Sequence, residues 1–158
     1  MTQKDKQLLL NDLCGRLPYG VRVLVSDTFP YSTIPGKNAV IKVSDIHDLI
    51  APVSLDERYN KSDKAFSKII QEHTEYLEFK PYLRPMSSMA EEEKDELNSI
   101  SHEFGFEWVD AKTTEERYMA NAKMQSRSTD FYNAHHLDYR GLIEKGLALE
   151  AHEDMYML

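Results

Sequence analysis

The segment NAHHLDYRGL, residues 133–142, holds the densest group of side chains that could do chemistry. The imidazoles of His135 and His136 could transfer a proton near neutral pH or bind a metal ion. A carboxylate at Asp138 and a guanidinium at Arg140 follow within four residues. The candidate catalytic residues are therefore His135, His136, Asp138 and Arg140, and the candidate metal ligands are His135 and His136.

The spacing of the two histidines argues against a simple metal site. Adjacent residues on a helix point about 100° apart, so this doublet does not chelate one ion as an i, i+4 pair does. A zinc ion would need further ligands from elsewhere in the chain, such as His73 or His102. No neighbouring residue identifies a nucleophile or an oxyanion pocket. We therefore predict no cofactor.

A structural interpretation accounts for more of the same segment. Asp138 is a suitable N-cap, and Gly146 is placed to end the following turn in a left-handed conformation. One face of this short helix would be buried, through Tyr139, Leu142 and Ile143. Arg140 would then reach a nearby carboxylate or a C-terminal carbonyl. The alternation in LALEA, residues 147–151, favours an edge strand.

The first half of the chain predicts one helix, two strands and a second helix. Leu9, Leu10, Leu13 and Cys14 have helical spacing, and Gly15 would end that helix in a left-handed conformation. Cys14 would act as a small hydrophobic residue. The patterns VRVLV (21–25) and AVIKV (39–43) predict a long-looped antiparallel pair. The second helix would start near residue 62 and bury a stripe, Phe66, Ile69, Ile70, His73 and Leu77.

The second half predicts more helices and one short strand. Pro81 and Pro85 make residues 79–88 a linker, after which the Ser88–Glu91 capping box starts a helix over 89–104 that ends at Gly105. This helix would bury Leu97, Ile100 and Phe104. FGFEWVD (104–110) is typical of a strand with Trp108 in the core.

A second capping box, Thr113 to Glu116, starts a helix that would run to about residue 125. A short helix over 131–136 would follow, capped by Ser128, Thr129 or Asp130. Together these elements predict one α+β domain over residues 1–158, with a small antiparallel sheet packed against several helices.

Composition narrows the classes of function. The 158 residues carry a net charge of −8, and the second half holds −7 of it. We find no cluster of Lys and Arg that would bind nucleic acid, so nucleic acid is an unlikely partner. Cys14 is the single cysteine, and no apolar stretch is long enough to span a membrane. These features favour a cytoplasmic protein without a membrane partner.

Three strings resemble a known family: LLLNDLCGRLPYGV (8–21), KPYLRPMSSMAEEEK (80–94) and NAHHLDYRGLIEKGLALEAHEDMY (133–156). In this combination and order they resemble short uncharacterised proteins of Bacteroides-type gut bacteria and of their phages and mobile elements. The resemblance implies a bacterial or phage cytoplasmic setting and an accessory or host-interaction role. It carries no catalytic residue over to this chain.

Two hypotheses of function follow. The first is a small, acidic, non-enzymatic interaction or regulatory protein with a protein partner. The alternative is a metal-binding or hydrolytic enzyme that uses His135, His136 and Asp138. Convergent polar groups in a pocket near His135 would favour the enzyme. Burial of Tyr139 and Leu142 against the core would instead favour a purely structural role for this segment.

Overall fold

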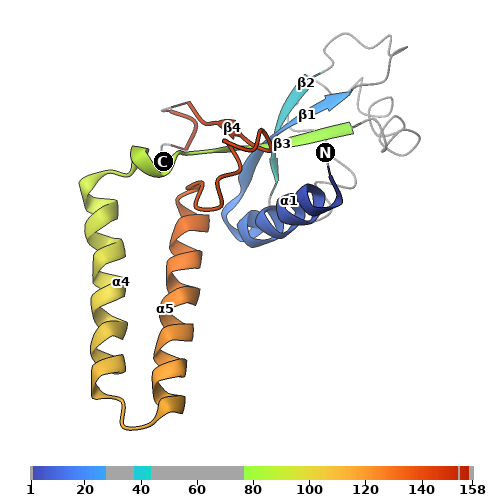
Figure 1. Ribbon diagram of the computed structural model, residues 1–158. Coiled ribbons are helices and arrows are strands. Elements are labelled where there is room, and N and C mark those ends of the chain that lie inside the picture. Colours follow the sequence, from blue (N-terminus) through green and yellow to red (C-terminus); the bar gives the residue numbers. More distant parts are fainter. Residues whose placement is uncertain (1, 28–37, 44–76, 153, 157–158) are drawn as a thin grey trace.

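A computed structural model describes residues 2–27, 38–43, 77–152 and 154–156. The fold is α+β, as predicted (Figure 1). Its helices are α1 (Gln3–Arg16), α4 (Glu91–Asp110) and α5 (Thr114–Ala134), with short 3-10 turns at η1 (Leu17–Tyr19) and η4 (Met86–Ser88). Its strands are β1 (Val21–Asp27), β2 (Asn38–Val43), β3 (Leu77–Leu83) and β4 (Leu149–Glu150).

The strands form one sheet in the order β2-β1-β3-β4. The predicted antiparallel pair is confirmed, with Val21 opposite Val43 and Val23 opposite Ile41. β3 lies antiparallel on the other side of β1. The predicted edge strand in LALEA is also confirmed, but it pairs parallel to β3, so the sheet is mixed.

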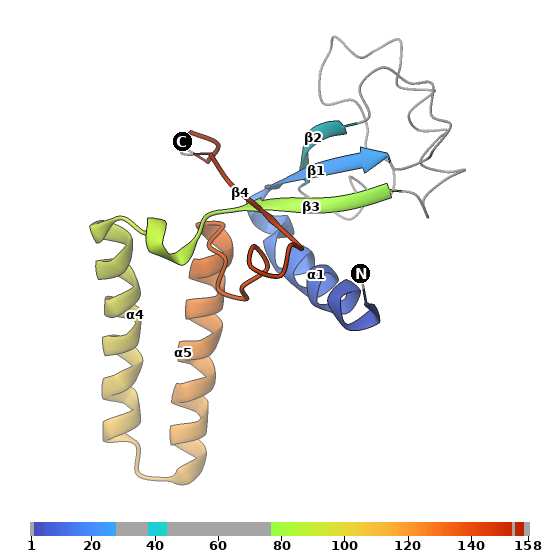
Figure 2. The ribbon, with the colours of Figure 1, turned by 45° about the horizontal axis from the view of Figure 1, so that its top comes forward.

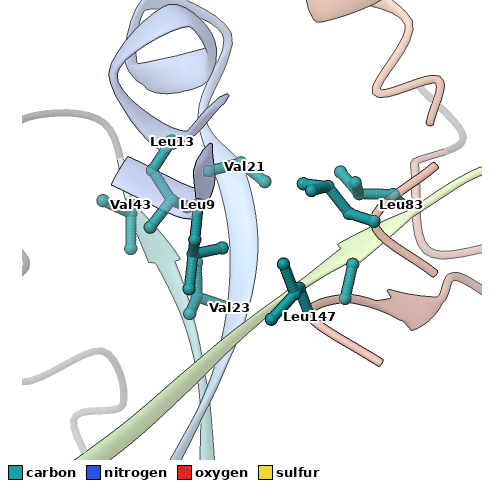
Figure 3. Packing of buried hydrophobic residues seen from close by; sticks show 9 residues of the cluster. Leu9, Leu13, Val21, Val23, Val43, Leu83 and Leu147 are labelled. Carbon is teal, nitrogen blue, oxygen red and sulfur yellow. The ribbon is translucent and has the colours of Figure 1, made fainter. Parts of the chain in front are cut away.

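Helix α1 packs on the sheet and forms the larger hydrophobic core with it (Figure 3). Leu9 and Leu13 lie one turn apart and meet the buried side chains of Val21, Val23 and Val43. The rest of this core comes from Leu83, Leu142, Leu147 and Ala148. Since Leu142 is fully buried here, the segment after the histidines helps to form the hydrophobic core under the sheet.

Two predictions about the end of α1 are wrong. The helix continues through Gly15 to Arg16, and the left-handed residue is Gly20, with φ of 71° after the η1 turn. Leu10 and Cys14 are exposed, because the stripe that contains Leu9 and Leu13 already faces the sheet. Cys14 is therefore not a buried hydrophobic residue.

The segment predicted as a linker forms strand β3 up to Leu83. Pro81 lies opposite Val23, and β4 pairs only with Tyr82 and Leu83, so on that side Pro81 has no ladder to interrupt. Proline is tolerated in a strand at such a position. The predicted helix over 62–77 lies outside the described residues except at Leu77, which belongs to β3.

Helices α4 and α5 form an antiparallel hairpin that projects from the sheet (Figures 1 and 2). Between the two helices a second hydrophobic cluster joins Ile100 and Phe104 of α4 to Phe131 of α5 and to Leu137. The predicted burial of Ile100 and Phe104 is confirmed, with Leu97 partly buried beside them. This cluster extends from the base of the hairpin, at Phe131 and Leu137, toward its tip, at Phe104.

Helix α4 differs from its prediction at both ends. Its N-cap is Ala90, whose amide donates to the Glu93 carboxylate at 2.8 Å, so Ser88 and Glu91 do not form the capping box. It runs through Gly105 to Asp110, which overturns the predicted strand. A glycine inside a helix costs only about 1 kcal/mol, which packing against a neighbouring helix can offset. Trp108 is 42% exposed and is not in the core.

Helix α5 begins at the predicted capping box, in which the Thr113 hydroxyl accepts from the Glu116 amide and the Glu116 carboxylate accepts from the Thr113 amide. The predicted break at 126–130 is wrong, because the helix is continuous to Ala134. Ser128, Thr129 and Asp130 therefore cap no second helix. Their preference for caps is overridden by burial of Phe131, which follows directly, against α4.

Candidate functional site

The histidine segment begins where α5 ends. His135 is the C-cap of α5, and His136 has a left-handed backbone with φ of 54°. The chain then runs beside Arg84, whose amide donates to the His136 carbonyl and whose carbonyl accepts from the Asp138 amide, both at 2.8 Å. These two bonds attach the end of the hairpin to the chain that leaves β3.

His135 belongs to a cluster of hydrogen-bonded polar side chains at the base of the hairpin. Its Nδ1 lies 2.8 Å from Oε1 of Glu93, and Arg84 donates to both oxygens of the same carboxylate at 2.7 and 2.8 Å. The Arg84 guanidinium is the main reason that the pKa of Glu93 falls to about 2. Glu93 is therefore charged at neutral pH and is fully engaged in holding α4 against Arg84 and His135.

His136 is 6% exposed and lies in a different environment. Its ring stacks on Tyr156, with centroids 3.8 Å apart. Its Nδ1 is buried and has no hydrogen-bond partner among the described residues. Burial, followed by the charge of Arg16, lowers the pKa of His136 to about 4, so the ring is neutral at physiological pH.

Asp138 and Arg140 both stabilise the turn structure. The Asp138 carboxylate accepts from the amides of Leu142 and Ile143 at 2.7 and 2.9 Å, and Gly146 has φ of 69°. The predicted cap and left-handed residue are thus present, although residues 138–146 form turns and not a short helix. Arg140 reaches a carboxylate, as predicted, since its Nε lies 3.4 Å from Oδ1 of Asp12.

The side chains of the four candidate residues therefore have different partners, although His135 and His136 both line one cavity. His135 pairs with Glu93, His136 stacks on Tyr156, and Asp138 caps the turn that follows it. In the described part of the chain, no group of three or more His, Cys, Asp or Glu side chains could hold a metal ion. His102 stacks on Phe106 along α4, and His73 lies outside the described residues.

One important polar pair, Asp12 with Arg16, is not among the residues predicted from the sequence. Asp12 and Arg16 are fully buried in α1 and form a two-point ion pair at 2.7 and 3.0 Å. The Arg16 guanidinium also donates to the Leu137 carbonyl at 2.8 Å. The signal was available, because an Asp and an Arg at i, i+4 face each other on a helix. This pair connects α1 to the histidine segment.

The far end of the hairpin is the second candidate site. Large apolar side chains near the tip are open to solvent: Phe106 is 68% exposed, Val109 69% and Tyr118 71%. Met119 and Trp108 are exposed beside them, and the Arg117 guanidinium lies 5.1 Å from the centre of the Trp108 ring. Helical spacing places Phe106 and Val109 on one side of α4, away from the buried Phe104.

A recess of about 760 Å³ lies between the two helices at this tip. Met119 and Ala120 contribute apolar surface to it. Its charged lining consists of Glu107, Asp110, Lys112, Glu115, Glu116 and Lys123. Acidic side chains outnumber basic ones here, and residues 91–134 as a whole carry a net charge of −6. The tip thus combines exposed apolar groups with a negative rim, which is suited to binding a basic surface.

No family model, no curated protein and no solved structure matches the chain. Among the described helices, none is both long and apolar enough to cross a lipid bilayer.

Proposed function

We propose that the protein is a non-enzymatic interaction or regulatory module that binds a protein partner through the tip of the α4–α5 hairpin. The partner offers a basic cleft with an apolar floor, into which the tip inserts. In line with the resemblance of three of its strings, we place this interaction in the cytoplasm of a bacterium or of its phage or mobile element.

The observation that carries this proposal is the concentration of exposed apolar side chains on the tip. Exposed apolar groups bordered by polar residues are a mark of interaction sites. Five large ones lie within residues 106–119, namely Phe106, Trp108, Val109, Tyr118 and Met119. Aromatic residues and methionine are enriched in protein interfaces, where they bury large areas. The tip therefore has the composition of an interface centre.

Charge and shape favour a basic protein cleft over other occupants. A second copy would bring two hairpins of net charge −6 together, and a nucleic acid would bring phosphates to the same acidic rim. Because Phe106 and Tyr118 belong to different helices and both are exposed, a cleft that surrounds the tip buries more apolar surface than a flat contact does. A basic rim on that cleft would pair with Glu107, Asp110, Glu115 and Glu116.

The test is capture of partners by the full-length tagged protein, in parallel with two variants. The tip variant carries Phe106→Ser, Val109→Ser and Tyr118→Ser. The control variant carries Leu10→Ser and Val40→Ser, which remove apolar side chains that are each 46% exposed but lie outside the hairpin. Circular dichroism confirms that all three proteins are folded.

We expect wild type and control to recover the same protein, and the tip variant to recover it about tenfold less, as for loss of interface hot spots. Recovery should fall as salt is raised. A photo-crosslinking residue at position 106 should attach to a basic segment of that protein. Equal recovery by wild type and tip variant, or no adduct from position 106, would contradict the proposal.

A further inference from the structure

A cavity of about 620 Å³ lies at the base of the hairpin, beside His135 and His136. Its lining comes from η1, β1 and β2, from Arg84 and the start of α4, and from the end of α5, the two histidines and the turn at residues 154–156. Its lining consists of Tyr19, Gly20, Arg22, Lys42, Arg84, Glu93, Ala134, His135, His136, Met155 and Tyr156. Three of these side chains are permanent cations in a protein whose net charge is −8.

Arg22 and Lys42 are directly opposite each other on the antiparallel strands β1 and β2. Directly opposed residues have their Cβ atoms about 5 Å apart on the same face of the sheet, and like charges in such a pair are destabilising. Among the described residues, no carboxylate forms an ion pair with either cation. The Arg22 Nε donates to the Met155 carbonyl at 3.0 Å, which holds the guanidinium at the cavity. An anion between these two cations would remove their repulsion.

The remaining polar groups of the wall do not cancel this positive charge. Arg84 is the third cation, and its charge is balanced by Glu93, which leaves the charges of Arg22 and Lys42 uncompensated in the lining. His136 also lines the cavity, and its buried Nδ1 has no hydrogen-bond partner in the described structure. Burial is the main cause of the lowered pKa of this histidine, and nearby positive charges, including Arg84 and Lys42, add to it.

The absence of a side chain at Gly20 leaves room for the Lys42 side chain in this wall. A side chain at position 20 would collide with Cε of Lys42, and the left-handed backbone at φ of 71° also favours glycine. Glycine thus lets the Lys42 chain lie directly over the backbone beside Arg22.

We infer that this cavity binds a small phosphate ester, with the phosphate between Arg22 and Lys42. A guanidinium and an ammonium together match the charge of a phosphate dianion, and guanidinium groups bind phosphate oxygens at two points. The cavity is larger than a phosphate alone, and the rings of Tyr19, His136 and Tyr156 line the remaining space. An organic group attached to the phosphate would contact these rings. This site is independent of the hairpin tip.

The test is a titration of the full-length, ¹⁵N-labelled protein at constant ionic strength, followed by NMR at the amides of Gly20 and Arg22. The probes are inorganic phosphate, adenosine monophosphate and glucose 6-phosphate, with adenosine and glucose as uncharged controls. We expect saturable shifts with all three phosphates and tighter binding of at least one ester than of inorganic phosphate. Adenosine and glucose should cause no such shifts.

Variants distinguish the site from general charge attraction. Arg22→Gln and Lys42→Gln should each weaken ester binding about tenfold, as for loss of a charge-assisted hydrogen bond. Lys4→Gln, which removes an exposed cation of α1, should leave it unchanged. No saturable shift with any phosphate, or the same loss in Lys4→Gln, would overturn the inference. If inorganic phosphate binds as tightly as either ester, the inference that the cavity also contacts an organic group would be overturned.

Discussion

The ring of Tyr156 stacks on His136, and its hydroxyl bridges two strands. The centroids are 3.8 Å apart, and the planes are inclined by 21°. The hydroxyl donates to the Tyr82 carbonyl at 2.7 Å and accepts from the Arg22 amide at 3.0 Å. Since Val23 is opposite Pro81, Arg22 and Tyr82 would be the next pair of the β1–β3 ladder. The hydroxyl thus extends the ladder beyond its last direct pair.

Tyr156→Phe should therefore lower stability by about 1–3 kcal/mol, because a backbone donor and a backbone acceptor each lose a partner. Burial raises the pKa of Tyr156 to about 12, so the hydroxyl remains a donor at neutral pH. Urea unfolding of wild type and variant measures the difference. Tyr82→Phe is the matched control, since only the Tyr82 backbone takes part in this bridge. Equal losses in the two variants would argue against the bridge.

The buried ion pair of α1 should be the most sensitive polar feature of the fold. Arg16→Met leaves Asp12 buried without its two-point partner and removes the donor to the Leu137 carbonyl. Loss of one member of a buried pair costs about 3–5 kcal/mol. Denaturant unfolding should show this loss, accompanied by weaker protection of the Leu137 region in hydrogen exchange.

The exposed pair of Glu91 and Lys94 provides the control for Arg16→Met. These residues are also close on one helix, with 2.6 Å between the charged atoms, but both are exposed. Lys94→Met should change stability little, because solvent screens such a pair. A similar small effect in Arg16→Met would mean that the buried pair contributes no more than a surface one.

His136 should make the protein acid-sensitive. Its folded-state pKa is about 4, below the ordinary value of 6.5, so the unfolded chain binds a proton more readily than the folded one between these pH values. Stability from this group is fully present above about pH 6.5 and is lost as pH falls toward 4. Glu93 has a pKa of about 2 and an ordinary value of 4.5, so its contribution is lost only at lower pH.

Unfolding free energies at pH 7 and pH 5 measure this effect. In wild type the stability should fall between the two, and in His136→Asn the fall should be smaller. Asparagine suits the control, because it tolerates the left-handed backbone at φ of 54° and does not titrate. An equal fall in both proteins would assign the acid sensitivity to other groups.

The elements that the sequence predicted well are those with a local signal. The alternating valines of β1 and β2 predict the antiparallel pair, and Thr113 with Glu116 predicts the start of α5. Asp138 and Gly146 likewise have the capping roles that their residue types favour. In each case the interactions that determine the structure join residues close together in the chain, or strands with a clear alternating pattern of apolar residues.

The errors arose where distant contacts override local preference. Gly105 and residues 126–130 look like helix ends, but α4 and α5 support each other along the hairpin and continue through them. Pro81 looks like a break in regular structure. However, β3 pairs with β1 along one side, and on its other side only Tyr82 and Leu83 pair with β4. The partners of His135 and His136, Glu93 and Tyr156, lie 42 and 20 residues away, so spacing within residues 133–142 could not reveal them.

Two glycines should respond to alanine in opposite directions. At Gly105, inside α4, an added Cβ meets nothing within 4 Å, so Gly105→Ala should stabilise the helix by about 0.5–1 kcal/mol. At Gly20 the left-handed backbone should make Gly20→Ala destabilising by about 1–2 kcal/mol, whereas the flexible end of Lys42 can move aside.

Thermal unfolding gives the sign of each change, and hydrogen exchange gives its location. Slower exchange in Gly105→Ala should be concentrated in residues 101–120, because the substitution lies in this part of α4 and large side chains near the tip are exposed. Stabilisation without that local pattern would mean that the tip unfolds together with the sheet. Tighter capture of the partner by Gly105→Ala would further connect the rigidity of the tip to binding, since an ordered surface loses less conformational freedom when it binds.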